Sequence, residues 1–290
     1  MRIGLWIDEL APSLDDMIAF AHAHTAFDSL WAGQRDGRDA LTALAVVGRA
    51  VDGPALGTAV VPTQPRHPLA LAAQALTVQE AVGGRLTLGV GVSHRPIVEG
   101  RFGLPYERPA RHLREYLSVL APLLRGESVA FEGETLKASG AVGVSTTAPS
   151  LLVGALGPAS LRIAGELADG VVTTWAGPEA LESYVVPALS GGAPRVVATV
   201  CVCVTGDEAG VRSMVAERFA VVGELPAYRA ILERGGARGP ADVIVAGDEA
   251  DVVEQLGRLA GAGATELLAV PIGTPEEQKR TTALLAGTKV

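Results

Sequence analysis

Residues 56–100 read LGTAVVPTQPRHPLALAAQALTVQEAVGGRLTLGVGVSHRPIVEG, and this stretch decides the fold. It predicts an apolar strand over 56–61 that stops at Pro62, because proline cannot donate a hydrogen bond to a sheet. A helix is expected over 68–81, with a proline in its first position and a glycine pair behind its end. A second apolar strand follows over 86–90. The short joints indicate a strand–helix–strand unit, whose two parallel strands end at the same edge of the sheet.

The alternation of strand and helix continues along the chain of 290 residues. Eight strands that are each followed by a helix predict an α/β fold, a closed (β/α)8 or TIM barrel, and an open doubly wound sheet is the alternative. The expected strands cover residues 2–7, 29–32, 56–61, 86–90, 151–155, 170–174, 195–204 and 265–271. The expected helices cover residues 14–24, 40–50, 68–81, 109–124, 158–168, 177–189, 207–221, 248–261 and 275–285.

Other segments depart from this alternation. We expect an irregular loop over 95–107, a strand pair or hairpin over 127–137, a turn over 191–194 and a short helix within 225–239. Together they predict one domain, 1–290, with insertions at about 95–147 and 222–240, after strands four and seven. Loops carry specificity, so these insertions are expected to supply the walls of a substrate pocket.

The composition favours an enzyme-sized core over a nucleic-acid or membrane protein. The chain is 48% hydrophobic but only 4% aromatic, so its core consists mainly of Ala, Val and Leu, which suits parallel strands buried on both faces. The net charge is −8 and no basic stripe is present, which argues against nucleic-acid binding. No apolar stretch is long enough to span a membrane.

The N-terminus and the two cysteines indicate a cytoplasmic protein. The first ten residues, MRIGLWIDEL, carry charges inside their apolar run, which is not the pattern of a signal peptide. Cys201 and Cys203 alternate along an expected strand and therefore share a face. We interpret them as small core residues rather than as a disulfide pair or a redox site.

A search for catalytic motifs excludes several classes. Gly89-Val90-Gly91 follows a strand, but His94 stands where a dinucleotide-binding fingerprint needs its third glycine. No phosphate-binding P-loop, nucleophile elbow or zinc-protease motif is present, and the histidines lack the spacing of metal ligands. No lysine stands at a strand end, where Schiff-base chemistry would need it. We therefore expect no metal and a reactivity that comes from an organic cofactor.

One turn has the chemistry of a phosphate site. The fifth expected strand ends in VGALGPAS, residues 153–160, with Gly157 in the turn and Pro158 opening a helix. The free N–H groups at a helix start, together with the positive end of its dipole, bind anions. Taken alone, this is also the pattern of an ordinary strand–helix turn. The turn indicates a phosphate site only in combination with the ends of strands three and four.

At these strand ends the chain resembles the bacterial-luciferase-like superfamily, in the branch of oxidoreductases that use the deazaflavin coenzyme F420. The resemblance covers nearly the whole chain. The matching pieces are GTAVVP (57–62), RHPLALAAQALTV (66–78), GGRLTLGVGVSHRPIVEG (83–100), RPARHLREYLSVL (108–120), ALGPASLRIAGELADG (155–170) and GDEADVVEQLGRLAGAGATELLAV (247–270). They are specific for the superfamily and less specific for the deazaflavin over FMN.

The resemblance implies a cofactor ring across the C-terminal mouth of the barrel. It implies a non-prolyl cis peptide at Ala59–Val60 behind the ring, Ser93 and His94 beside the cofactor's side chain and phosphate, and a phosphate-binding turn. The cofactor-binding residues that follow from it are Ala59, Val60, Val61, Gly91, Ser93, His94, Ala155, Leu156, Gly157 and Pro158. The cofactor is expected to be F420, with FMN as the alternative.

The loop after strand two departs from the family pattern. Related deazaflavin enzymes often carry an Asp-His or similar pair there, whereas this chain has Gln34 and Arg35. A glutamine can hydrogen-bond a ring or substrate oxygen but is no proton donor at neutral pH. His94, with an ordinary pKa of about 6.5, is the best remaining acid or base, and the alternative is a loop histidine bonded to the backbone. The catalytic candidates are thus His94 and Gln34.

Other residues have two interpretations each. Asp8 either lines the pocket or caps a turn, and Trp175 is a candidate wall of the substrate pocket, whereas Trp31 is expected in the core. Arg66 is either a cofactor contact or part of an ion pair. The arginines of the first insertion form a solvated face or meet the polyglutamate tail of F420; they are Arg101, Arg108, Arg111 and Arg114.

The function expected from the resemblance is hydride transfer between F420 and a small organic substrate. The reaction would reduce a C=C, C=N or C=O bond or run in reverse as a dehydrogenation. The alternatives are an FMN-dependent monooxygenase of the same fold and a non-catalytic barrel that binds a flavin or deazaflavin. A homodimer is expected, and the substrate itself is not specified by the sequence.

Overall fold

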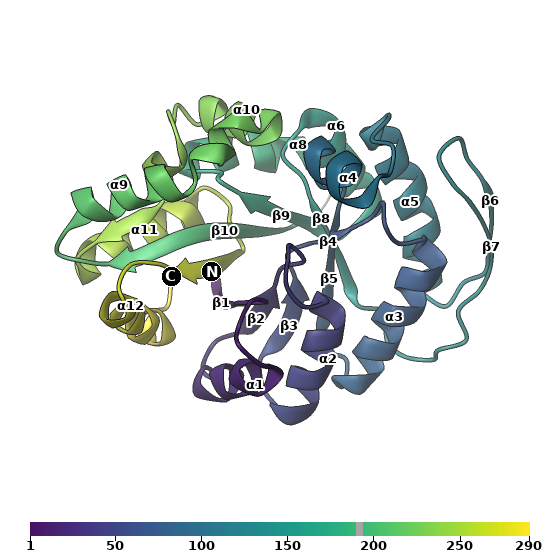
Figure 1. Cartoon of the computed structure of the whole chain (residues 1–290), viewed down its shortest axis with the longest axis horizontal. Coiled ribbons are helices and arrows are strands. Elements are labelled where there is room, and N and C mark those ends of the chain that lie inside the picture. The colour runs from purple at the N-terminus through teal and green to yellow at the C-terminus, as the bar shows by residue number, and fades with distance from the viewer. Residues whose placement is uncertain (190–193) are drawn as a thin grey trace.

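The computed structural model describes residues 1–189 and 194–290, and its parallel strands close into a barrel surrounded by helices (Figure 1). In the described chain the barrel strands run in the order β10-β12-β1-β2-β3-β5-β8-β9, and β9 pairs with β10 to complete the circle. The eight-stranded (β/α)8 prediction is confirmed. The strands are β1 (Arg2–Ile7), β2 (Ser29–Ala32), β3 (Ala55–Thr58), β5 (Leu86–Gly91), β8 (Ser150–Gly154), β9 (Gly170–Thr174), β10 (Arg195–Val204) and β12 (Glu266–Pro271).

Several helices begin where a side chain satisfies free N–H groups of the first turn. Ser13, Asp39, Asp248 and Thr274 each accept a hydrogen bond from the first turn of the helix that follows. The outer helices are α1 (Leu14–Ala23), α2 (Ala40–Ala50), α3 (Pro68–Ala81), α5 (Pro109–Leu124), α6 (Pro158–Leu167), α7 (Pro178–Ala180), α8 (Val186–Ala188), α9 (Glu208–Arg218), α11 (Glu249–Gly261) and α12 (Pro275–Gly287). A π-helical turn, Leu181–Val185, joins α7 to α8.

The third barrel strand is interrupted, which corrects the prediction of a continuous strand over 56–61. The backbone leaves β3 after Thr58 and returns to the sheet as β4 (Val61–Pro62), which pairs with β5. Between the two segments the peptide bond Ala59–Val60 is cis, as the resemblance implied. The apolar run is continuous in sequence, but the backbone direction is not.

The segment 95–107 contains a helix where an irregular loop was predicted, so that prediction was wrong. Helix α4 (Arg95–Phe102) has a proline in its first turn, and Gly103 ends it in the left-handed conformation with φ 63°. Proline is favoured in the first turn of a helix, and glycine is favoured just after its end. These signals for the two helix ends were present in the sequence, but the helix has only eight residues and few of them are apolar.

The remaining insertions agree with expectation, with one addition. β6 (Val129–Glu132) and β7 (Lys137–Gly140) form an antiparallel hairpin, and α10 (Pro226–Arg234) is the short helix after β10. The short strand β11 (Val245–Gly247) was not predicted and extends the sheet beside the end of β10. In the turn expected over 191–194, residues 191–193 lie outside the described residues.

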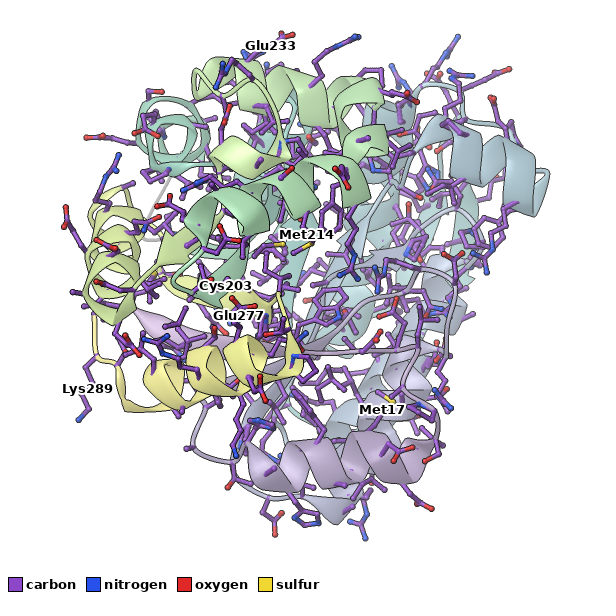
Figure 2. The ribbon with its side chains drawn as sticks, turned by 60° about the vertical axis from the view of Figure 1, so that its left-hand side comes forward. Met17, Cys203, Met214, Glu233, Glu277 and Lys289 are labelled. Carbon is purple, nitrogen blue, oxygen red and sulfur yellow. The ribbon has the colours of Figure 1, made fainter. Side chains whose placement is uncertain are left out.

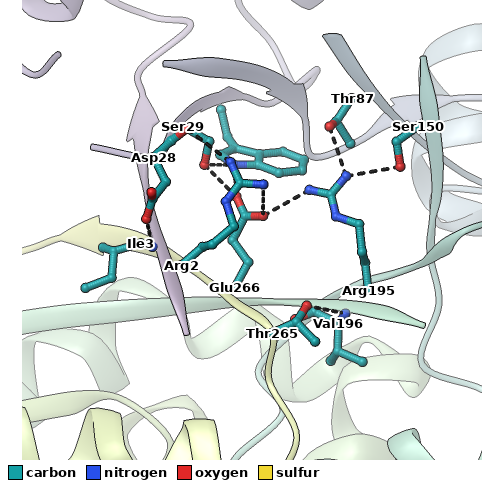
Figure 3. A network of polar contacts seen from close by, with 11 residues as sticks. Arg2, Ile3, Asp28, Ser29, Thr87, Ser150, Arg195, Val196, Thr265 and Glu266 are labelled. Atoms are coloured by element: carbon teal, nitrogen blue, oxygen red, sulfur yellow. Dashed lines mark hydrogen bonds and ion pairs between the residues drawn. The ribbon is translucent and has the colours of Figure 1, made fainter. Parts of the chain in front are cut away.

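A polar network closes the N-terminal end of the barrel (Figure 3). Glu266, 1% exposed, accepts hydrogen bonds from the hydroxyl of Ser29 at 2.5 Å, from the indole N–H of Trp31 at 3.1 Å and from the guanidinium of Arg195 at 2.9 Å. Arg195 also donates to Thr87 and Ser150. A buried carboxylate is tolerated when it is paired in this way.

Above this network the barrel interior is apolar. Trp31, a predicted core residue, is completely buried there, and it packs with Leu152, Val172, Val197 and Leu268. Trp6 and the Ala59–Val60 segment lie partly buried against this cluster. Both the polar network and the apolar layer fill the lower barrel, which leaves the C-terminal end for a ligand. Within the described residues no helix is long and apolar enough to cross a membrane.

Candidate active site

A cavity of about 1980 Å³ opens at the C-terminal ends of the barrel strands. Both insertions contribute to it, as predicted, through Ile97, Phe102 and Tyr106 on one side and Leu225 and Tyr228 on the other. The predicted site residues that line it are Asp8, Gln34, Ala59, Val60, Gly91, Ser93, His94, Ala155, Leu156, Gly157 and Trp175. Two predicted residues, Val61 and Pro158, lie outside the lining of this cavity.

Val61 is fully buried in the core, which explains its place outside the cavity. The neighbouring Val60 does reach the wall, and three glycines surround it. A Cβ at Gly91 or Gly154 would stand 2.8 Å or 3.0 Å from a methyl carbon of Val60. At Gly89 it would stand 2.0 Å from the carbonyl oxygen of Thr58. The glycines that resemble a dinucleotide fingerprint are therefore required by close packing around the Ala59–Val60 segment.

His94 meets a tyrosine that the sequence did not single out. Its ring lies edge-on to Tyr228 of α10, with 4.8 Å between the ring centroids. Burial lowers the pKa of His94, so the imidazole is neutral at pH 7. Burial raises the pKa of Tyr228, so its hydroxyl keeps its proton. The contact therefore brings together two groups that can carry a proton, His94 from the end of β5 and Tyr228 from the second insertion.

The residues around His94 hold an unusual backbone in place. Ser93 has φ 58°, in the left-handed region, and its carbonyl oxygen accepts a hydrogen bond from the hydroxyl of Tyr106 at 3.0 Å. Arg95 donates to the carbonyl oxygen of Tyr106 at 2.9 Å. These contacts tie the start of α4 to the loop that follows α4, and they fix the direction in which Ser93 and His94 enter the cavity.

Trp175 also has a left-handed backbone, with φ 61°. It is 9% exposed, lines the cavity and packs edge-on against Phe219, with 5.0 Å between the ring centroids. The structure therefore places it in the mouth, where the sequence suggested a wall. Phe219 comes from the segment after α9, so the aromatic pair joins the sixth and seventh strand ends.

Gln34 and Asp8 line the cavity, but each also serves the local backbone. The side-chain oxygen of Gln34 accepts from the N–H of Ala40 at 2.9 Å, at the start of α2. Asp8 accepts from the N–H of Leu10 at 3.0 Å, so the pocket and capping interpretations both hold for it. The amide N–H₂ of Gln34 remains the group it can offer a ligand.

Sequence reasoning missed an ion pair beside these residues, between a buried carboxylate and a half-exposed arginine. Glu9 is completely buried, and its carboxylate accepts a hydrogen bond from Arg35 at 2.5 Å. This hydrogen bond, together with the charge of Glu9, raises the pKa of Arg35. Arg35 lines the cavity and stacks over Trp6, 5.5 Å from the ring centroid. The two adjacent carboxylates after strand one, Asp8 and Glu9, were the sequence signal for this ion pair. Their partner Arg35 could not be assigned because it lies in another loop.

The turn before α6 offers an anion site. Within the described residues no side chain caps this helix, and Pro158 has no N–H to offer. Gly157 and Ser160 line the cavity, and the hydroxyl of Ser160 donates to the carbonyl oxygen of Gly157 at 3.0 Å. The unpaired N–H groups of the first turn, with the helix dipole, suit a phosphate at this wall of the cavity.

The arginines with two interpretations are engaged in ion pairs. Arg66 pairs with Asp39, the residue that caps α2, which decides in favour of the ion pair. Arg101 pairs with Asp36 across the cavity mouth. Arg108 and Arg111 both pair with Glu134, and Arg114 pairs with Glu166. These pairs favour the solvated-face interpretation of the first insertion; the contact with a polyglutamate tail stays a prediction.

The two cysteines are free and buried, as expected for core residues. Cys201 lines the cavity wall, and burial raises its pKa to about 12. Burial and the charge of Glu277 raise the pKa of Cys203 to about 11. Both thiols therefore stay protonated at neutral pH and are poor nucleophiles.

Comparison with known proteins places the whole chain in one family. The profile of the luciferase-like monooxygenase family matches residues 2–286. A 5,10-methylenetetrahydromethanopterin reductase of Archaeoglobus fulgidus is 29% identical over an aligned length of 303, and the match covers 88% of each chain. An F420-dependent glucose-6-phosphate dehydrogenase of Nakamurella multipartita is 34% identical over 206 residues, 65% of this chain; the match spans 60% of that relative's length.

Solved structures show the same fold at lower identity. An F420-dependent secondary alcohol dehydrogenase in complex with an F420-acetone adduct superposes with a TM-score of 0.80 and 17% identity, over 98% of this chain and 97% of that one. The oxygenating constituent of 3,6-diketocamphane monooxygenase of Pseudomonas putida, in complex with FMN, superposes with a TM-score of 0.74 and 16% identity, over 99% and 97%. The fold is therefore shared by proteins with either cofactor.

Proposed function

Because this chain belongs to the luciferase-like monooxygenase family, we propose that it is an oxidoreductase that transfers a hydride between coenzyme F420 and a small organic substrate. The observation that carries the proposal is one continuous cavity at the barrel mouth that has an uncapped helix start in its wall. Such a cavity suits a flat ring with a phosphate-bearing side chain. The named F420-dependent relative supports the deazaflavin.

The chain offers a holding residue for each part of the cofactor. The N–H groups of the first turn of α6, beside Gly157 and Ser160, would hold the phosphate. Ser93 and His94 would border the side chain, and Val60 would back the ring. When bound, F420 supplies or accepts the hydride; the protein supplies position, exclusion of water and proton handling.

The proton is the part of the reaction that this chain's own residues would handle. His94 is neutral at pH 7 because burial lowers its pKa, so one ring nitrogen can accept a proton while the other holds one. Reduction of a C=C, C=N or C=O bond needs one proton besides the hydride, and the reverse reaction releases one. Gln34 would orient a substrate oxygen through its amide N–H₂.

An FMN-dependent monooxygenase is the second candidate, because an FMN complex shares this fold. A non-catalytic barrel that binds a flavin or deazaflavin is the third. A fluorescence titration of the purified protein with F420 and with FMN separates the cofactors. We expect micromolar or tighter binding of F420 and weaker binding of FMN; no F420 binding, with oxygen consumption that depends on reduced FMN, would contradict the proposal.

Turnover separates an enzyme from a binding protein. Reduced F420 is mixed with a panel of enones and imines, and oxidised F420 with a panel of alcohols. We expect at least one compound to change the F420 absorbance at a rate proportional to protein concentration. Tight F420 binding without turnover of any compound would favour the non-catalytic barrel.

We further propose that the enzyme acts in the cytoplasm as a single-domain homodimer on a small-molecule substrate, without nucleic acid, membrane or metal. The free, buried state of Cys201 and Cys203 supports a reducing compartment. Light scattering of the purified protein tests the dimer directly.

A further inference from the structure

Helices α1 and α12, the first and last of the ring around the barrel, both line one side of the cavity. Helix α1 packs against α2, and α2 against α3. Over residues 1–189 and 194–290, α12 makes no comparable contact with α1. The two helices nevertheless lie side by side in Figures 1 and 2, where Met17 marks α1 and Glu277 marks α12. The space between them is part of the same cavity as the barrel mouth.

This space, which we call the α1–α12 groove, has one aromatic wall and one wall of small side chains. Phe20, His24 and Phe27 form a row, with ring centroids 4.2 Å apart in the first pair and 5.9 Å in the second. The opposite wall consists of Thr282, Ala283 and Ala286. On a helix such spacing places these three side chains on one face. The groove is therefore shaped by two helix faces that do not meet.

Two polar groups in these walls bond to the backbone of their own helices. The Nδ1 atom of His24 lies 2.7 Å from the carbonyl oxygen of Phe20, and the hydroxyl of Thr282 donates to the carbonyl oxygen of Gln278 at 2.7 Å. Charged lining residues, Asp16 and Lys279, stand within the first five residues of α1 and α12, next to the mouth. Farther along, the described lining is uncharged.

The groove is long enough for an extended chain. From residue 278 to residue 286 of α12 it runs roughly 12 Å at the helical rise of 1.5 Å per residue. The whole cavity, about 1980 Å³, is well above the roughly 300–1000 Å³ of an ordinary small-molecule pocket. A cofactor ring and a small substrate would fill the barrel mouth but would not occupy the groove.

We propose that the α1–α12 groove binds the hydrocarbon chain of an elongated substrate whose reactive end lies at the barrel mouth. The position of the reactive end rests on the proposed function; binding of the chain does not. An extended peptide fits less well, because its N–H and C=O groups would lie unpaired against apolar walls. Continuity with the mouth favours a substrate over a second copy of the protein, which the experiment also examines.

The experiment measures the binding of 1-butanol and 1-octanol by calorimetry. Each of the four additional methylenes tightens binding by about fourfold when buried, so 1-octanol should bind about 250-fold more tightly than 1-butanol. Ala283→Trp fills the groove from α12 and should weaken 1-octanol binding at least tenfold. Ala209→Trp is the matched control, an exposed alanine of α9 outside the cavity lining, and should bind like the wild type. Ala286→Phe replaces Ala283→Trp if that variant does not fold.

Three results would overturn the inference: equal affinity for both alcohols, equal 1-octanol affinity in the groove and control variants, or a wild-type dimer that dissociates in Ala283→Trp. The last result would assign the groove to a second copy. F420 titrations on the same samples keep the two proposals apart. Loss of F420 binding with intact chain-length selectivity counts against the proposed function alone, and the converse counts against the groove alone.

Discussion

The imidazole of His94 stands edge-on to the phenol ring of Tyr228, with 4.8 Å between the ring centroids. One residue follows β5 and the other belongs to α10, after β10. Burial lowers the pKa of His94 and raises that of Tyr228, so the pair is uncharged at neutral pH. We propose that, at a mouth where Gln34 and Arg35 follow the second strand, this pair holds and moves the proton of the reaction.

His94→Gln is expected to lower kcat by roughly 100-fold, because general acid–base groups contribute at least that much. The rate is measured with F420 and whichever compound the wild type turns over. Tyr228→Phe keeps the ring contact and removes only the hydroxyl, so it should retain most of the activity. If Tyr228→Phe loses activity and His94→Gln keeps it, the proton belongs to the tyrosine and this assignment is wrong.

Ser160→Asp is expected to weaken F420 binding about tenfold. It places a carboxylate in the first turn of α6, where the dipole and N–H groups would otherwise attract a phosphate, and like charges repel there. Ser160→Ala, which removes the hydroxyl without adding charge, should bind F420 within twofold of the wild type. Fluorescence titration measures both, and equal affinity in the two variants would move the phosphate away from α6.

The free energy of unfolding is expected to be smaller at pH 5.5 than at pH 7.5. Burial lowers the pKa of His94 and of His112, so below about pH 6.5 the unfolded chain binds more protons than the folded one, and stability falls as pH falls through this window. Urea titrations at the two pH values measure the difference. The double variant His94→Gln/His112→Gln should show a smaller difference, and an unchanged one would contradict the assignment.

The carboxylate of Glu277 affects the free energy of unfolding in a lower pH range than the histidines. Hydrogen bonds from Thr205 and Thr274 lower the pKa of Glu277, so its contribution to stability is present above the ordinary glutamate pKa of about 4.3 and is lost as pH falls below it. The comparison between pH 5.5 and 7.5 therefore reports mainly on the histidines.

Glu266→Leu is expected to lower the free energy of unfolding by about 3–5 kcal/mol, because it leaves the Arg195 guanidinium without the buried carboxylate that balances its charge. Glu276→Gln, on the exposed start of α12, should stay within about 0.5 kcal/mol of the wild type. Urea unfolding at pH 7.5 gives both values. A small loss in Glu266→Leu would show that the network at the barrel floor contributes little.

Gly89→Ala is expected to destabilise the fold strongly, by about 3 kcal/mol or more, since the added Cβ would stand 2.0 Å from the carbonyl oxygen of Thr58. Gly100→Ala is the matched control, because no atom lies within 4 Å of its added Cβ and alanine favours the helix α4 by about 0.5–1 kcal/mol. Thermal unfolding should shift in opposite directions. Equal shifts would contradict close packing at Gly89.

Local elements could be predicted because their causes are local. The bounds of α3 (Pro68–Ala81) and α5 (Pro109–Leu124) agree with expectation. A proline marks each start, a glycine pair follows the end of α3, and apolar periodicity fills the length of α5. Helix α4 was missed because it has only eight residues and few of them are apolar, although Pro96 and Gly103 mark its two ends. The interruption between β3 and β4 could not be predicted, because the apolar run in the sequence continues across the change of backbone direction.

The sequence by itself determined the barrel, its strand order and the edge that carries the site, because strand–helix alternation makes every parallel strand end on one side. Most predicted site residues follow strand ends and therefore line one cavity. Only the tertiary structure decided the contact of His94 with Tyr228, the pairing of Glu9 with Arg35 and the gap between α1 and α12. Each depends on the distance between segments far apart in the chain, which no local pattern of residues encodes.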